Sequence, residues 1–83
     1  MESSFTIEKQ RLLSALTNIK RNNPDDSKIE LRIQDQRIEL EAYEHLIYLK
    51  ASTKGTGEYM LNPGDFIVSV ESYKEDVITV TFI

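Results

Sequence analysis

The sequence of 83 residues contains no cysteine, and this absence removes several classes of chemistry at once. Without thiols the chain forms no disulfide, holds no metal through thiolates and has no cysteine nucleophile. Such a composition fits a reducing compartment, so the cytoplasm is the expected location. No segment reaches the ~20 apolar residues of a membrane span. The N-terminus has no basic stretch followed by an apolar run, and we expect neither a secretion signal nor a membrane role.

Histidine is scarce too, since His45 is the only one in the chain. A metal ligand or a general base needs partners at suitable spacing, and none accompanies His45. The Gly55-Thr56-Gly57 segment lacks the third glycine and the following helix that a dinucleotide or phosphate site requires. The sequence therefore predicts a protein that is not an enzyme and that uses no catalytic residue, cofactor, metal ion or small-molecule substrate.

Charge, in contrast, is plentiful and unevenly distributed. The formal net charge is −4, but residues 1–28 sum to +1 and residues 29–83 sum to −5. The plain explanation of so modest an asymmetry is that both parts are solvated surfaces kept charged for solubility. The same asymmetry also defines one mildly basic and one acidic surface on which a binding function can be based.

The N-terminal part predicts a short strand at Phe5-Thr6-Ile7, followed by an amphipathic helix over 8–21 and a surface loop over 22–27. At 3.6 residues per turn, one face of that helix is apolar and the opposite face is polar. The apolar stripe consists of Leu12, Leu13, Ala15, Leu16 and Ile19. A lone helix of this length is marginal in water, so we expect its apolar face to cover a sheet.

The chain after the loop follows the period of two that is typical of strands. Apolar and polar residues alternate over 29–33 and again over 38–42, which predicts a hairpin with one dry face. The alternation fails at Tyr43-Glu44-His45, where a bend or bulge is expected. A further strand is predicted over about 46–52.

The segment around Pro63 contains the main ambiguity of the sequence. Residues 66–70 are rich in β-branched side chains, which favours a strand. Pro63 with Asp65 close behind also permits a short second helix over 63–72, because proline fits the first helical position and an acid suits the first turn. Propensity alone favours the strand.

Together these patterns predict one α+β domain over 1–83, with a mainly antiparallel sheet of about five strands covered by the helix over 8–21. Turns at 53–57 and 62–65 separate the later strands, and a final apolar strand runs over 77–83. An apolar strand in that position must be paired or covered, or it becomes an edge for association. A protein partner or self-association is therefore expected.

Two surfaces are candidates for binding. The basic candidates lie on the polar side of the predicted helix or at its boundary: Arg11, Arg21, Lys9 and Lys20. The acidic candidates lie on predicted strands, where we expect solvated side chains: Glu39, Glu41 and Glu58. A basic helix face can contact nucleic-acid phosphates, whereas an acidic face can bind a basic protein.

The order of the segments resembles part of the bacterial DNA sliding clamp, the beta subunit of DNA polymerase III. FTIEKQRLLSALTNI is similar to the opening strand and first helix of a clamp, and IELRIQDQRIELEAYEHLIYLKAS to the paired strands that follow. Ala42-Tyr43-Glu44 stands where clamps commonly have a Thr-Asp bend. GEYMLNPGDFIVSVESYKEDVITVTFI is similar to a strand, a second helix and a returning strand. The similarity spans residues 5–83 and corresponds to part of one clamp domain.

This resemblance has several implications. It makes 63–72 a helix, against the propensity of those residues, and it places the stripe carrying Arg11 and Arg21 on the DNA-facing side of a ring. It implies a non-catalytic binding module that acts in DNA metabolism by association. The alternative function, from the acidic residues, is a small inhibitor or immunity-type protein that binds a basic enzyme or toxin through its sheet.

Overall fold

The computed structural model describes residues 2–22, 28–42 and 45–83, and these contain seven strands and two helices. The strands are β1 (Ser3–Glu8), β2 (Ile29–Gln34), β3 (Arg37–Ala42), β4 (His45–Lys50), β5 (Ser52–Lys54), β6 (Gly57–Leu61) and β7 (Val77–Phe82). The helices are α1 (Lys9–Asn22) and α2 (Pro63–Glu71). Three strands form sheet A in the order β5-β1-β7, and four form sheet B in the order β4-β3-β2-β6.

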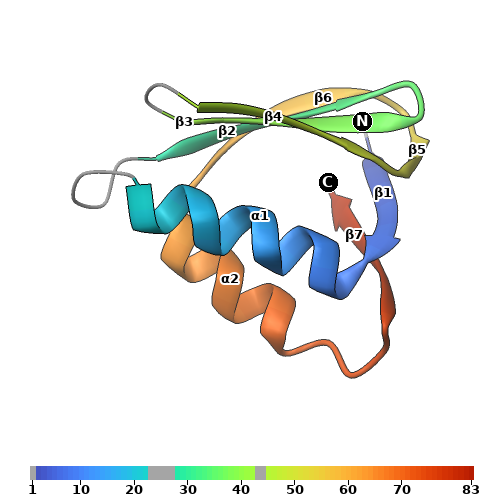
Figure 1. Cartoon of the computed structure of the whole chain (residues 1–83). Coiled ribbons are helices and arrows are strands. Elements are labelled where there is room, and N and C mark those ends of the chain that lie inside the picture. Colours follow the sequence, from blue (N-terminus) through green and yellow to red (C-terminus); the bar gives the residue numbers. More distant parts are fainter. Residues whose placement is uncertain (1, 23–27, 43–44) are drawn as a thin grey trace.

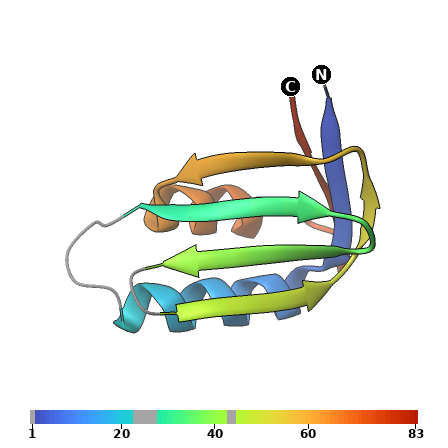
Figure 2. The same ribbon diagram turned by 90° about the horizontal axis from the view of Figure 1, so that it is seen from above.

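Sheet B and the two helices form two layers, with the helices side by side beneath the sheet (Figure 1). Sheet A stands at one end of the molecule, where β1 crosses the ends of the strands of sheet B (Figure 2). The core between the layers is one apolar cluster with residues from both sheets and both helices. The predicted α+β class, with an antiparallel sheet covered by a helix, is therefore confirmed.

Helix α1 docks on the sheet through the stripe that the sequence predicts. Leu12, Leu16 and Ile19 are buried, and Leu13 and Ala15 pack against the same core from its margin. The helix begins one residue later than predicted, because Glu8 still pairs with Val77 as the last residue of β1. Burial of the apolar face, more than helix propensity, stabilises a helix of this length.

The predicted hairpin is formed by β2 and β3, which pair from Glu30 opposite Glu41 to Gln34 opposite Arg37. Its dry face contains Ile29, Leu31, Ile33, Ile38, Leu40 and Ala42, all of them buried. Of the predicted loop over 22–27, residues 23–27 lie outside the described residues and Asn22 is the last residue of α1. Of the predicted bend at 43–45, residues 43–44 lie outside them and His45 begins β4.

The structure divides the strands between two antiparallel sheets, with seven strands among the described residues where the sequence predicts a mainly antiparallel sheet of about five. The difference arises after Lys50, where the chain leaves sheet B and enters sheet A. The predicted turn at 53–57 is shorter than expected, because Ser52–Lys54 is strand β5, paired with β1. Three polar residues carry no periodic signal, and their strand state depends on a partner distant in sequence.

Residues 66–70, which propensity assigns to a strand, belong instead to α2. The predicted turn before them is the beginning of this helix: the Asn62 side chain accepts a hydrogen bond of 3.0 Å from the backbone N–H of Asp65. Phe66 and Val70 lie one turn apart and are both buried. The cap and this burial outweigh β propensity, whose whole range is only ~1 kcal/mol. The helix is the state that the clamp resemblance implies.

One aromatic contact joins the two sheets. The ring of Tyr59 in β6 stacks on that of Phe82 in β7, with 4.2 Å between ring centroids and 14° between planes. The Tyr59 hydroxyl also shares a hydrogen bond with Ser3 Oγ in β1. Sheet B is thereby tied to both long strands of sheet A.

Candidate functional site

The basic candidates all lie on α1, which carries four cations and no acid. The burial of Leu12, Leu16 and Ile19 fixes the rotation of the helix about its axis. The position of each cation along the helix therefore decides which neighbouring element it faces. As a result the four cations do not form a single stripe.

Two of these cations face α2. Lys9 is half-buried, and its Nζ donates a hydrogen bond of 2.8 Å to the backbone oxygen of Tyr73, just beyond the end of α2. Lys20 is exposed, and its Nζ lies beside Gly64 in the first turn of α2. Lys9 thus has a structural role in holding the two helices together.

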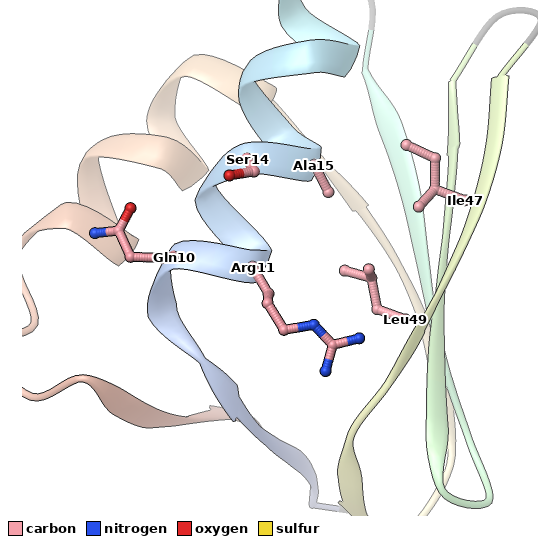
Figure 3. A pocket seen from close by; sticks show the side chains of 6 residues that line it. All are labelled: Gln10, Arg11, Ser14, Ala15, Ile47 and Leu49. Atoms are coloured by element: carbon pink, nitrogen blue, oxygen red, sulfur yellow. The ribbon is translucent and has the colours of Figure 1, made fainter.

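Arg11 lies on the other side of α1, over a groove between this helix and the edge strand β4 (Figure 3). The groove has a volume of about 490 Å³ and is lined by Gln10, Arg11, Ser14, Ala15, Ile47 and Leu49. Arg11 is exposed, and the stem of such a side chain can cover apolar surface while its charged end stays in water. Arg21 is exposed in the last turn of α1.

The outer surface between the two helices is polar with little charge. A shallow hollow there is lined by Gln10, Leu13, Ser14, Thr17 and Glu71. Helix α2 contributes two acids, Asp65 and Glu71, and no base. The helix layer is therefore basic along α1 and mildly acidic along α2, with Arg11 on the side of α1 away from α2.

The acidic candidates lie on the outer face of sheet B, around Arg32. Arg32 is opposite Glu39 on β3 and opposite Glu58 on β6. Its guanidinium forms ion pairs with Glu30 at 2.6 Å, Glu41 at 2.7 Å and Glu39 at 2.8 Å. Hydrogen bonds to Glu41, Glu39 and Glu30 raise the pKa of Arg32 above its ordinary value.

The sequence predicts that Glu39 lies on a solvated strand face. In the structure its side chain is only 8% exposed, so this prediction does not hold for Glu39. Besides Arg32, it contacts Arg37 Nη2 at 3.4 Å, and the Arg37 guanidinium lies over the ring of Tyr48 at 4.8 Å. Glu41 and Glu58 are exposed. Much of the predicted acidic face is therefore engaged in contacts within the molecule.

Sequence reasoning missed Arg32 as the centre of this cluster, although a signal exists. The hairpin turns at Asp35 and Gln36, and Gln36 adopts a positive φ of 62°. A two-residue loop fixes the register, and counting outward from it places Arg32 opposite Glu39. The pairing thus follows from turn geometry once the turn is located.

No arrangement for metal binding is found in the described ranges: no three His, Cys, Asp or Glu side chains are placed to hold an ion together. His45 is exposed at the start of β4. Within those same ranges, neither helix is long and apolar enough to cross a membrane.

Comparison with known proteins defines the fold class. No protein-family model matches this sequence, and no curated protein is significantly similar to it. Solved structures of DNA polymerase III beta subunits match it in fold. A protein described as such a subunit from Eubacterium rectale matches with a TM-score of 0.88 at 18% identity. The subunits from Borrelia burgdorferi, in complex with a natural product, and Thermotoga maritima match with TM-scores of 0.84 and 0.80 at 13% and 10% identity.

The match covers nearly all of this chain and a minor part of the others. Each of the three alignments includes 98% of this chain, but only 24%, 23% and 24% of the respective subunit. The chain therefore has the fold of part of a sliding-clamp subunit, as its sequence suggests. Neither these solved structures nor the ion pairs of Arg32 support the alternative prediction of an acidic inhibitor.

Proposed function

We propose that this chain is a non-catalytic binding module that associates with duplex DNA through the exposed side of α1. The observation that carries the proposal is the charge of this helix, four cations and no acid, within the fold of DNA polymerase III beta subunits. Such a role fits the expected cytoplasmic location and leaves room for a protein partner.

Arg11 and Arg21 are the residues that we assign to phosphate contacts. They are ten positions apart, which corresponds to about 15 Å along the helix axis. A duplex presents about nine phosphate charges over that length. Guanidinium groups bind phosphate oxygens with two parallel hydrogen bonds, so two exposed arginines can position a duplex without reading its sequence.

The overall negative charge of the chain does not contradict this proposal. The cluster of Glu30, Glu39, Glu41 and Glu58 lies on the outer face of sheet B, and α1 lies on the opposite side of that sheet (Figure 1). Exposed charges further apart than a Debye length, ~8 Å at physiological salt, are largely screened from one another. The electrostatic interaction of a duplex at α1 would therefore be mainly with the cations of that helix.

Duplex-DNA binding at low salt, followed by fluorescence anisotropy, tests the assignment. We expect Arg11→Glu with Arg21→Glu to weaken binding at least about tenfold and to lower the slope of log K against log salt by about 2. The matched control is Lys54→Glu with Lys74→Glu, which changes the net charge equally at exposed positions outside α1. Equal losses for the two pairs, or no binding by the unmodified chain, would remove the role of the helix.

A further inference from the structure

The groove between α1 and the edge strand β4 exposes part of the inner face of sheet B. Ile47 and Leu49 point from β4 toward the helix, with Ala15 on the helix side (Figure 3). Both strand residues are only half-buried, whereas Leu40 and Ile38, their partners on β3, are fully buried. Apolar surface at this edge therefore remains in contact with water, and covering it is favourable.

The groove exists because the side of α1 toward β4 carries small residues. Ser14 and Ala15 line it at positions where longer side chains would fill the space. Its volume of about 490 Å³ lies within the range of roughly 300–1,000 Å³ that is typical of small-molecule sites. A stable protein partner needs roughly 1,000 Å² of contact area, but the helix surface next to the groove is polar, with Gln10, Ser14 and Asn18 exposed. The dimensions therefore favour a small molecule over a protein.

Arg11 determines which charge fits this groove. Figure 3 shows its guanidinium extended from α1 toward β4. Among the described residues Arg11 forms no ion pair, and the residues that line the groove include no acid. A guanidinium binds a carboxylate through two parallel hydrogen bonds. An occupant with a carboxylate at one end and an apolar body complements both the cation and the floor.

We propose that the groove binds the anion of a small apolar carboxylic acid, with its carboxylate at Arg11 and its hydrocarbon part over Ile47 and Leu49. The occupant is a free monocarboxylate of the size of a medium-chain fatty acid. An uncharged hydrocarbon would leave Arg11 without a partner, and inorganic phosphate would leave the two strand residues in water. Arg11 also belongs to the proposed DNA contacts, but the ligand site does not rest on them and is tested without DNA.

Titration of the nitrogen-15-labelled chain with decanoate, followed by NMR, tests the site directly. We expect saturable shifts of amide signals in α1 and β4, with a dissociation constant of about 1 mM or lower. Hexanoate is shorter by four methylene groups. It should bind at least about tenfold more weakly, because each fully buried methylene contributes a factor of about four.

Filling the groove provides the first pair of variants. Ala15→Leu places a larger apolar side chain against Ile47 and Leu49, so it should abolish decanoate binding without lowering the midpoint of thermal unfolding. Thr17→Leu is the matched control, because Thr17 is exposed on α1 and does not line this groove. It should leave the affinity for decanoate unchanged.

Removing a cation provides the second pair. Arg11→Gln should weaken decanoate binding at least about fivefold, because hydrogen bonds between charged groups are the stronger ones. Lys20→Gln removes the same charge from α1 on the side that faces α2. This control should change the affinity less than about twofold. Circular dichroism checks that each variant is folded.

Each result has a defined meaning. Shifts that do not saturate, or that spread over the outer face of sheet B, overturn the site. Equal losses for Ala15→Leu and Thr17→Leu overturn its location, and equal effects of Arg11→Gln and Lys20→Gln overturn the role of the guanidinium. Loss of binding with Ala15→Leu, together with a selective effect of Arg11→Gln, supports the proposal.

Discussion

At the scale of single residues, Arg32 is the feature with the clearest energetic consequence. One guanidinium serves three carboxylates, and Glu39 among them is nearly excluded from water. A buried carboxylate is tolerated when a cation and hydrogen bonds compensate its lost hydration. Removing the cation would leave Glu39 charged, poorly hydrated and close to Glu41.

We therefore expect Arg32→Met to lower the midpoint of thermal unfolding clearly, and Glu39→Gln in the same chain to restore part of the loss. Arg37→Met is the matched control: Arg37 is 51% exposed, and its contact with Glu39 is longer, at 3.4 Å. Exposed ion pairs contribute little, so this substitution should have a small effect. Thermal melts followed by circular dichroism compare the three variants, and equal losses for Arg32 and Arg37 would refute this account of Glu39.

At the scale of elements, α2 depends on Asn62, the residue that caps its first turn, more than its composition suggests. Asn62 satisfies the Asp65 N–H, one of the donors that the beginning of every helix leaves without a partner. We expect Asn62→Ala to lower the free energy of unfolding by about 1 kcal/mol, and Asn62→Asp to preserve it, because aspartate caps as well as asparagine. In a domain of this size the alanine variant should melt about 4–8 °C lower. Urea titration measures both, and equal stability of the two variants would exclude a capping role.

Features that depend on residues close together in sequence were predictable, and features that depend on distant contacts were not. The sequence predicts the buried face of α1 and the hairpin of β2 and β3, because both follow from the spacing of apolar residues that are close together in sequence. The buried residues of α1 are Leu12, Leu16 and Ile19. Propensity alone does not give helix α2 or strand β5, since their state depends on packing against distant segments. For α2, the helix is the state that the clamp resemblance implies. The sequence likewise places the cations on α1. The sequence does not predict the hydrogen bond from Lys9 to the Tyr73 backbone oxygen, because this bond depends on where α2 packs.

At the scale of the whole molecule, the two sheets are held together by few specific contacts. Tyr59 and Phe82 stack across the junction, and Phe82 in turn lies 6.5 Å from Phe5, measured between ring centroids. Stacked aromatic pairs contribute about 0.5–1.5 kcal/mol beyond the burial of their area. Loss of one contact at this junction is therefore expected to destabilise both sheets.

A double-mutant cycle with Tyr59→Leu and Phe82→Leu measures that coupling. We expect each single substitution to lower the free energy of unfolding. The loss in the double variant should be about 1 kcal/mol smaller than the sum of the two single losses. Tyr59→Phe provides the control, since it retains the stack and removes only the hydrogen bond to Ser3. Additive losses in urea unfolding would mean that the rings stabilise their own sheets independently.

The pairing of β1 with β7 joins the first and the last of the described strands, with a consequence for biosynthesis. Phe5 and Ile7 are synthesised before α1, but Ile78 and Val80, with which they pair in the folded state, are synthesised only after α2. A nascent chain must therefore hold this apolar segment unpaired while the rest is translated, the condition in which growing polypeptides recruit chaperones. The N-terminal strand, together with the apolar face of α1, is the stretch that we expect such a chaperone to shield.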